Sequence, residues 1–277
     1  MNIFGRRQSS TPIASAIGVN PGANLALHLD GVRRAPPAID VIKRMPGLIG
    51  LVDPAYTLGS TSGGYDFIRC LLTGSIYLSP IQHKTNIIRT AGVGKLITTE
   101  NNQHFLPDPN ATIVMPRDNW SIFWVTETRE KGLRFFMSLA TQHRSNEARK
   151  FSIGLKGGKV CMFDHAPRAA SYGTANTSIA GAGLVICGIT MSSKLGIRFY
   201  TNNKRNGEHR SKTEMLSPVE INRTFQFFGT RNLYANGAAG KHGQYAFFAE
   251  DYSKAEYSTA RSVVHAAMSE HYGIALT

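Results

Sequence analysis

Short runs of alternating hydrophobic and polar residues fill most of the chain, and glycine, proline or asparagine separates one run from the next. Alternation with a period of two is the pattern of β-strands that bury one face. Tyr65–Leu72 and Ser75–Leu78, around Gly74, predict a hairpin. Further strands are predicted at Asn86–Thr90, Lys95–Thr99, Ala111–Met115, Trp120–Thr126, Leu133–Leu139, Phe151–Leu155, Lys159–Phe163, Leu184–Met191, Leu195–Thr201, Phe225–Gly229 and Gln244–Ala249.

Some of these runs also indicate where their strands lie. Trp120–Thr126 is apolar on both faces, as expected of a strand in the middle of a sandwich. Gly157 and Gly158 predict a tight hairpin turn between two strands. Ile39–Met45 predicts a short helical turn that Pro46 and Gly47 end. The pattern as a whole predicts an all-β fold.

The end of the chain has helical spacing instead. Ser253 and Glu256 have the spacing of a capping box, in which each side chain bonds the other residue's free backbone donor. Gly273 predicts a left-handed end to the helix, with Ile274 folding back onto the last turn. The predicted apolar stripe is Ala260, Val263, Val264, Ala267, Met268 and His271, with Arg261, Ser262, His265, Ser269 and Glu270 on the opposite face.

The order of these elements, with Tyr252-Ser-Lys-Ala-Glu256 and Tyr272-Gly-Ile274, resembles the C-terminal part of concanavalin A-like (laminin G-like) jelly-roll domains of phage and bacterial surface proteins. Tyr252 departs from the leucine usual in that family. The family's Tyr-x-Asn-Gly hairpin corresponds to Tyr200 and Asn206-Gly207, which a basic insertion separates here. The resemblance covers residues 85–277, with weaker support over 25–84. It implies a jelly-roll sandwich over residues 25–277, preceded by an extended N-terminal arm, residues 1–24, and ending in one α-helix.

Composition limits the classes of protein to which the chain can belong. With 277 residues, of which 42% are hydrophobic and 18% charged, it is expected to fold around a substantial core. The formal net charge of +13 favours an acidic partner. Cys70, Cys161 and Cys187 lack the spacing of a metal site and are expected to be buried free thiols. No run reaches the ~20 apolar residues of a membrane span.

The sequence lacks the motifs of catalysis and cofactor binding. Glycan hydrolases of this fold carry paired carboxylates on one strand, whereas Glu127 and Glu130 are expected on opposite faces. Glycine-rich stretches lack the spacing of phosphate loops, and the histidines lack that of metal sites. Asp108 and Asn110 are weak candidates for a calcium loop, where neighbouring prolines favour a plain turn. We expect no catalytic residue, no metal and no cofactor.

A dense basic segment is the main candidate site. Lys204, Arg205, His209, Arg210 and Lys212 lie close together after the strand that ends at residue 201. One interpretation is a solvated loop. The other is a finger that binds a phosphate, an acidic glycan or a neighbouring subunit. Nucleic acid is not expected, because aromatic residues do not alternate with the basic ones.

These features lead to two main functional hypotheses and one remote alternative. The first is a non-enzymatic structural or adhesion protein of a phage virion (a decoration, fibre or tail component), which docks through its arm and basic surface onto other virion or surface proteins and onto copies of itself. The second is a lectin-like carbohydrate-binding module for a host or surface glycan, with Tyr172 and Tyr234 as possible contacts. A glycoside hydrolase or lyase is the remote alternative. The expected location is the virion, or alternatively the bacterial cell surface.

Overall fold

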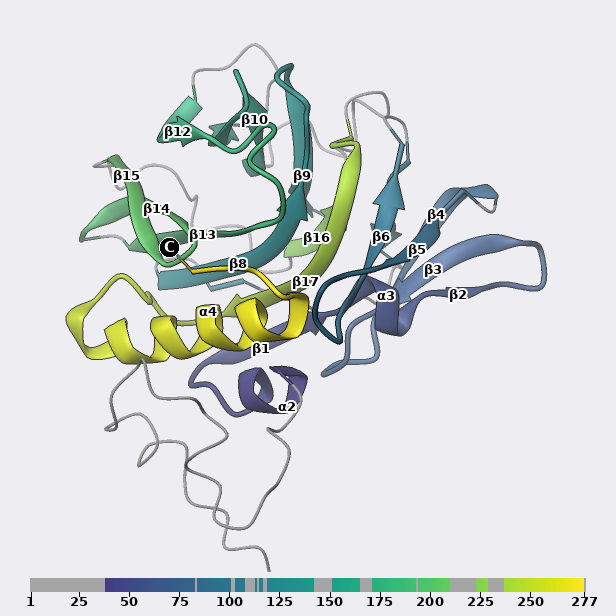
Figure 1. Cartoon of the computed structure of the whole chain (residues 1–277), viewed down its shortest axis with the longest axis horizontal. Helices are drawn as coiled ribbons and strands as arrows, with labels where there is room; N and C mark the ends of the chain where they lie inside the picture. Colours follow the sequence, from purple (N-terminus) through teal and green to yellow (C-terminus); the bar gives the residue numbers. More distant parts are fainter. Residues whose placement is uncertain are drawn as a thin grey trace, which may run out of the picture.

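The chain folds into antiparallel β-sheets with one long C-terminal helix, as the sequence predicts (Figure 1). The computed structural model describes residues 38–82, 84–100, 103–107, 113, 115–116, 119–141, 151–164, 171–192, 194–209, 223–228 and 237–276. The predicted arm, residues 1–24, and the predicted start of the domain at residue 25 lie outside this part of the chain.

The helices are α2 (Ala38–Lys43), α3 (Pro54–Thr57) and α4 (Ser258–Tyr272), and a short 3₁₀ turn, η3 (Ala255–Tyr257), precedes α4. The strands are β1 (Leu48–Val52), β2 (Gly59–Ser60), β3 (Tyr65–Arg69), β4 (Ile76–Gln82), β5 (Asn86–Arg89), β6 (Lys95–Thr99), β7 (Leu106–Pro107), β8 (Asn119–Glu127), β9 (Arg134–Thr141), β10 (Phe151–Lys156), β11 (Lys159–Asp164), β12 (Ser171–Ser178), β13 (Val185–Ser192), β14 (Gly196–Thr201), β15 (Lys204–His209), β16 (Arg223–Phe227) and β17 (Gly240–Phe248).

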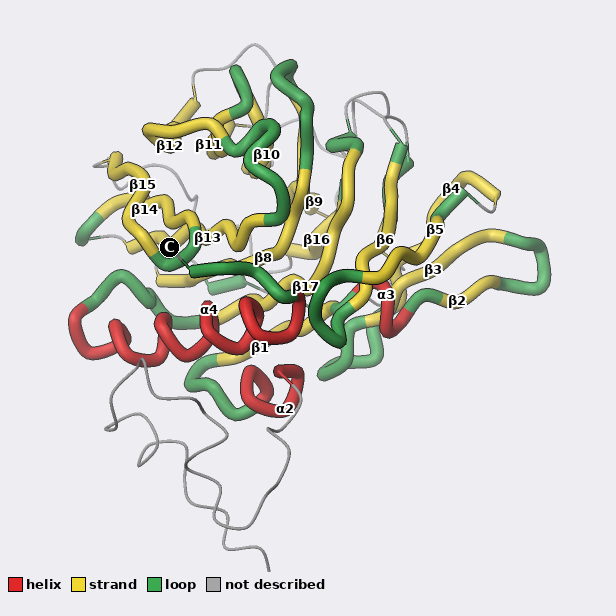
Figure 2. The backbone as a smooth tube through the Cα atoms, in the orientation of Figure 1, coloured by secondary structure: helices red, strands yellow, loops and turns green. Residues whose placement is uncertain are grey.

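Three sheets make up the sandwich. The largest has eight strands in the order β15-β14-β13-β8-β17-β6-β5, with β1 paired to β17 beside β6. A five-stranded sheet, β12-β11-β10-β9-β16, packs against one face of it, and a small sheet, β2-β3-β4-β7, extends to one side (Figure 2). The helices α2 and α4 cover the opposite face of the large sheet.

The central strand β8 is buried on both faces, as its sequence predicts. Trp120 and Trp124 point into the main core between the sheets, whereas Phe123 packs into a second core beneath α2 and α4. Each tryptophan is fully buried. A strand covered by a sheet on one side and by helices on the other needs apolar residues at successive positions, which explains the absence of alternation here.

Helix α4 differs from its prediction at the start and agrees with it at the end. It begins at Ser258, after η3, and its N-cap residue makes no side-chain capping bond. The predicted capping box is therefore wrong, because the Ser253 hydroxyl donates instead to the Asp251 carboxylate over 2.6 Å. Gly273 ends the helix in the left-handed region with φ of 66°, and the Ile274 N–H donates to the Ser269 carbonyl.

The buried face of α4 is close to the predicted stripe. Ala260, Val264, Ala267 and Met268 are buried as predicted. His265 is also buried, although the sequence predicts it on the face opposite the apolar stripe. Its ring packs edge-on against Phe123 at 5.0 Å between centroids, so the sheet beneath the helix supplies an aromatic surface for it.

The last hairpin of the large sheet turns earlier than predicted. Asn202 and Asn203 form the turn between β14 and β15, with φ of 47° and 66°, and Asn206-Gly207 lies within β15. Asparagine adopts positive φ more readily than other residues with a Cβ, and two in succession fit a two-residue hairpin turn. The insertion thus supplies the turn itself, and its basic residues Lys204 and Arg205 begin β15.

Other predictions for the described residues can be compared directly. The hairpins around Gly74 and at Gly157-Gly158 are confirmed. The strand predicted at 111–115 is not seen at Ile113 or Met115, whose side chains are nevertheless buried. The three cysteines are buried and free. In the part of the chain that the structure describes, no helix is both long and apolar enough to cross a bilayer.

Candidate functional site

The described part of the predicted basic site lies on an edge strand. Lys204, Arg205 and His209 belong to β15, the outermost strand of the large sheet, and all of them are exposed. Arg210 and Lys212 lie outside the described residues. Charged side chains are a common device for preventing an edge strand from pairing with another chain, which gives this segment a structural role. Its predicted anion-binding role stays a prediction.

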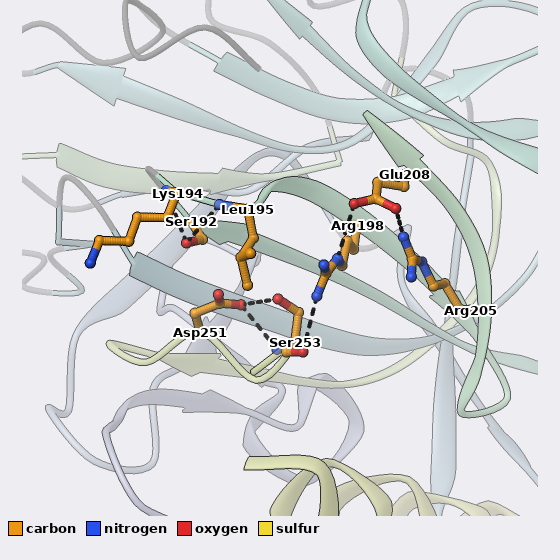
Figure 3. A network of polar contacts seen from close by, with 8 residues as sticks. All are labelled: Ser192, Lys194, Leu195, Arg198, Arg205, Glu208, Asp251 and Ser253. Atoms are coloured by element: carbon orange, nitrogen blue, oxygen red, sulfur yellow. Dashed lines mark hydrogen bonds and ion pairs between the residues drawn. The ribbon is translucent and has the colours of Figure 1, made fainter. Parts of the chain in front are cut away.

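Much of the positive charge on β15 is neutralised within the fold. Glu208 lies between Arg198 and Arg205 and forms an ion pair with each of them (Figure 3). Arg198 also donates to the backbone carbonyl of Ser253, which ties β14 to the segment before α4. Two of the basic residues in this region therefore have internal partners and are less free to bind an external anion.

The inner side of β15 holds the two large layers together. The Asn206 side chain accepts hydrogen bonds from the Thr177 N–H and hydroxyl at 2.9 and 2.7 Å, and donates to the Thr201 hydroxyl. Thr177 belongs to β12, the outer strand of the five-stranded sheet. The edges of the two sheets are thus joined at this corner, and Asn206 is a structural residue.

The aromatic and calcium-loop candidates from the sequence stay predictions, because their side chains lie outside the described part of the structure. Tyr172 lies on β12 rather than on a loop, and the position of its side chain is outside the description. Tyr234 and the calcium-loop candidates Asp108 and Asn110 lie outside the described residues. No group of three or more metal-binding side chains occurs among the residues that the structure describes.

The two carboxylates considered for catalysis are occupied by basic partners. Both Glu127 carboxylate oxygens accept from Lys241 Nζ at 2.9 Å, across the β8–β17 pair. Glu130 forms an ion pair with Arg134 at 3.3 Å. These bonds fix the two side chains as parts of the loop structure at this end of the sheet.

A second surface, which the sequence analysis did not identify, lies on the outer face of the small sheet. Alternation along β3 directs Ile68 and Cys70 into the main core and Tyr65, Phe67 and Arg69 outward. Leu78 of β4 is the cross-strand partner of Phe67 and shares this face. We call Tyr65, Phe67, Arg69 and Leu78 the aromatic sheet face.

The side chains of the aromatic sheet face are open to solvent but held in place. Tyr65 is 37% exposed and Leu78 40% exposed. The tip of the Phe67 ring lies over Gly59, where a Cβ atom would come within 2.5 Å of it. Arg69 places its guanidinium carbon 5.9 Å from the centre of the Phe67 ring, within the range of a cation–π contact. Glycine at position 59 is therefore needed for the observed ring position.

The helix beside β3 carries an additional exposed ring. Tyr56 of α3 is 73% exposed. The neighbouring Thr57 hydroxyl accepts from the Arg69 N–H at 3.2 Å, so α3 lies directly beside β3. In Figure 1 the β2–β3 hairpin and β4 project from the body of the molecule, which makes the small sheet accessible.

The sequence contains a signal for this face in the alternation of β3 rather than in any loop. Tyr65-Asp-Phe-Ile-Arg-Cys70 alternates between two aromatic residues and an arginine on one side and Asp66, Ile68 and Cys70, all of them buried, on the other. Exposed aromatic residues in succession on one side of a strand are more informative than isolated apolar residues at the surface.

No protein-family model and no curated protein matches this sequence. Solved structures with a similar fold include domain 4 of AbnA, an extracellular arabinanase from Geobacillus stearothermophilus, in complex with arabinotriose. Its TM-score is 0.55 at 9% identity, and the alignment covers 79% of this chain and 99% of that domain. The likeness shows a shared β-sandwich fold.

Two further structures are binding domains. That of Paraclostridial Mosquitocidal Protein 1 has a TM-score of 0.53 at 11% identity, covering 80% of this chain and 52% of that one. That of botulinum neurotoxin serotype G has a TM-score of 0.51 at 13% identity, covering 80% and 51%. The chain thus spans about half the length of each of these two domains. At such identities the comparison concerns the fold alone.

Proposed function

We propose that the chain is a non-catalytic, lectin-like carbohydrate-binding module that holds a glycan against the aromatic sheet face. The observation that carries this proposal is the alignment of Tyr65, Phe67 and Arg69 on the solvent-facing side of β3. The C–H faces of a sugar ring pack against aromatic rings, while its hydroxyl groups accept hydrogen bonds from a neighbouring cation. Aromatic walls with a few polar groups are typical of ligand sites.

The fold supports this proposal over the virion role predicted first. The compared structures include a sugar complex and two binding domains, all built on a related sandwich. We further propose that the sandwich is of the concanavalin A-like type, because α4 ends as that resemblance implies, at Gly273 with Ile274 folded back. Fold similarity alone does not establish function, so the chemistry of the face carries the argument.

The absence of catalysis is part of the proposal. Glu127 and Glu130, the carboxylates considered for hydrolysis, are each engaged by a basic side chain. A retaining glycosidase needs one carboxylate free to attack and another free to donate a proton. The ion pairs at Glu127 and Glu130 support a binding role over a hydrolytic one.

Tyr65→Ala is expected to weaken glycan binding about tenfold or more, because it removes one of two rings from the centre of the surface. Tyr65→Phe keeps the ring and is expected to retain most of the affinity. Gly59→Ala leaves every aromatic residue in place but displaces the Phe67 ring, so it is also expected to weaken binding. Calorimetric titration with a glycan selected on an array measures all three effects.

A control away from this surface separates binding from general damage. Val93, 73% exposed in the β5–β6 turn, can be replaced by alanine with no expected effect on affinity. Circular dichroism and unfolding curves should show that every variant is folded. Unchanged affinity in folded Tyr65→Ala and Gly59→Ala would remove the aromatic sheet face as the glycan site.

The virion role, with docking through the arm and self-association, stays a prediction. Residues 1–24 lie outside the described part of the chain, and the compared structures named above are not virion proteins. Light scattering of the full chain and of a chain lacking residues 1–24 tests it. A defined oligomer that the truncation converts to a monomer would favour assembly through the arm.

A further inference from the structure

Three loops meet at one end of the sandwich. The Gly181 N–H donates to the Thr128 carbonyl at 2.9 Å, which joins the loop after β12 to the loop after β8. The Ile179 N–H donates to the Gly158 carbonyl at 2.9 Å, which joins the same loop to the β10–β11 turn. The β8–β9 loop, the β10–β11 turn and the β12–β13 loop therefore form one continuous surface.

Basic side chains are concentrated on this surface. Arg129 and Lys131 lie in the β8–β9 loop, and Lys156 and Lys159 flank the β10–β11 turn. Arg129, Lys131 and Lys156 are exposed, and Lys159 is half-buried. None of the four forms an ion pair with another residue in the described part of the chain. We call Arg129, Lys131, Lys156 and Lys159 the basic loop end.

Two of these cations are placed unfavourably for the isolated protein. Lys156 and Lys159 are directly opposite each other in the β10–β11 register. Like charges at opposed positions of an antiparallel pair repel and weaken the pairing. Positive φ at both Gly157 and Gly158, 62° and 75°, makes the turn tight and keeps the two lysines together.

The two acidic residues at the adjoining β8–β9 loop do not relieve this repulsion. Glu127 is held by Lys241, with both carboxylate oxygens at 2.9 Å from Nζ. Glu130 is held by Arg134 at 3.3 Å. Since Glu127 and Glu130 already have basic partners, neither of them neutralises the basic loop end, and its positive charge is left for a ligand.

We infer that the basic loop end binds the carboxylate or sulfate groups of an acidic polysaccharide. The choice of polysaccharide over protein or nucleic acid rests on the proposed function, whereas the location of the site does not. Nucleic acid is less suitable, since single-strand binding needs aromatic rings beside the cations and this loop surface presents none among its described residues. The surface is distinct from the aromatic sheet face, which lies on the small sheet.

The large sheet contains a matched control for the opposed lysines. Arg89 and Lys95 are likewise exposed and directly opposite each other, in the β5–β6 hairpin. There the helix α4 explains why two opposed cations are tolerated, because the Gly94 N–H of that hairpin donates to the His271 carbonyl at the end of the helix. Cations are favoured near a helix C-terminus. Arg89→Ala/Lys95→Ala removes the same charge as Lys156→Ala/Lys159→Ala.

The test is binding of the full chain to dextran sulfate over a series of salt concentrations, with unmodified dextran and a single-stranded oligothymidine as comparison ligands. Lys156→Ala/Lys159→Ala is expected to weaken dextran sulfate binding about fivefold or more at low salt and to reduce its dependence on salt. Arg89→Ala/Lys95→Ala is expected to stay within about twofold of the wild type. Both double variants are surface changes and should remain folded.

Three outcomes would overturn the inference. They are no binding of dextran sulfate at low salt, equal losses in the two double variants, and tighter binding of oligothymidine than of dextran sulfate. Tyr65→Ala, measured in parallel, separates this inference from the proposed function. Dextran sulfate binding that survives in Tyr65→Ala but is lost from the lysine variant supports the basic loop end, whatever the aromatic sheet face binds.

Discussion

Phe227→Ala is expected to lower the free energy of unfolding by about 3–5 kcal/mol, the usual cost of removing a phenylalanine ring from a core. Phe227 is fully buried at the end of β16. Its ring packs edge-on against Tyr77 of the small sheet at 4.9 Å and against Tyr245 of the large sheet at 5.2 Å between centroids. One side chain therefore contacts all three sheets, counting its own.

The backbone of Phe227 adds to this junction. Its N–H and carbonyl exchange hydrogen bonds with those of Phe105, just before β7, at 3.1 and 3.0 Å. Urea unfolding followed by circular dichroism measures the effect. Phe67→Ala removes an identical ring that is only half-buried, on the aromatic sheet face, and is the matched control. If Phe227→Ala lowers the free energy of unfolding no more than Phe67→Ala does, the claim that Phe227 joins the three sheets is wrong.

Acidification is expected to destabilise the protein well above the pH at which most carboxylates titrate, because two histidines are buried in neutral form. Burial lowers the pKa of His242 to about 3, against the opposing effect of its hydrogen bond with the Ala238 carbonyl. Burial also lowers the pKa of His265 to about 4, and the charge of Arg261 acts in the same direction. An unfolded chain would protonate both near pH 6.5.

The direction in which the free energy of unfolding changes with pH depends on whether the folded or the unfolded state binds more protons. Below about pH 6.5 the unfolded state is protonated at both histidines while the folded state is not, so protons stabilise the unfolded state. Stability is therefore complete above about pH 6.5 and is lost as the pH falls toward 4, by roughly 1.4 kcal/mol per pH unit for each histidine. Above pH 6.5 these two groups contribute no dependence on pH.

Urea unfolding at pH values between about 7.5 and 4.5 measures this slope. His242→Gln/His265→Gln lacks both titrating groups, and its unfolding free energy is expected to fall less steeply over the same range. The absolute stability of the variant is expected to be lower at neutral pH, because His242 also contacts the Thr99 and Thr126 hydroxyl groups. Equal slopes for the wild type and the variant would show that neither histidine is buried in neutral form.

The strand pattern was predictable because alternation and turn residues act locally. The fully apolar β8 and the Gly157-Gly158 turn follow from their own sequences. The resemblance predicts the β14–β15 turn at Asn206-Gly207, whereas the chain turns at Asn202-Asn203. There the Asn202 side chain also accepts from the Ile186 N–H at 2.9 Å, a bond between segments distant in sequence. Such a contact is not visible in a short window.

The errors at the candidate sites have the same physical origin. The spacing of Ser253 and Glu256 predicts a capping box, but the Ser253 hydroxyl donates to the Asp251 carboxylate instead. The sequence leaves the basic segment open between a solvated loop and an anion-binding finger, and its described residues Lys204, Arg205 and His209 lie on an edge strand. The alternation in Tyr65–Leu72 predicts a strand but not which of its faces is exposed, because burial of one face of β3 depends on how the small sheet packs. The opposition of Lys156 and Lys159 follows from the predicted hairpin.

Binding of the full chain to a glycan array, with Tyr65→Ala alongside, tests whether the protein binds a glycan through the aromatic sheet face. We expect the wild type to bind at least one class of glycan saturably, and folded Tyr65→Ala to lose that signal. Binding of no glycan by the folded wild type, or an identical pattern from Tyr65→Ala, would contradict a lectin-like module that acts through the aromatic sheet face.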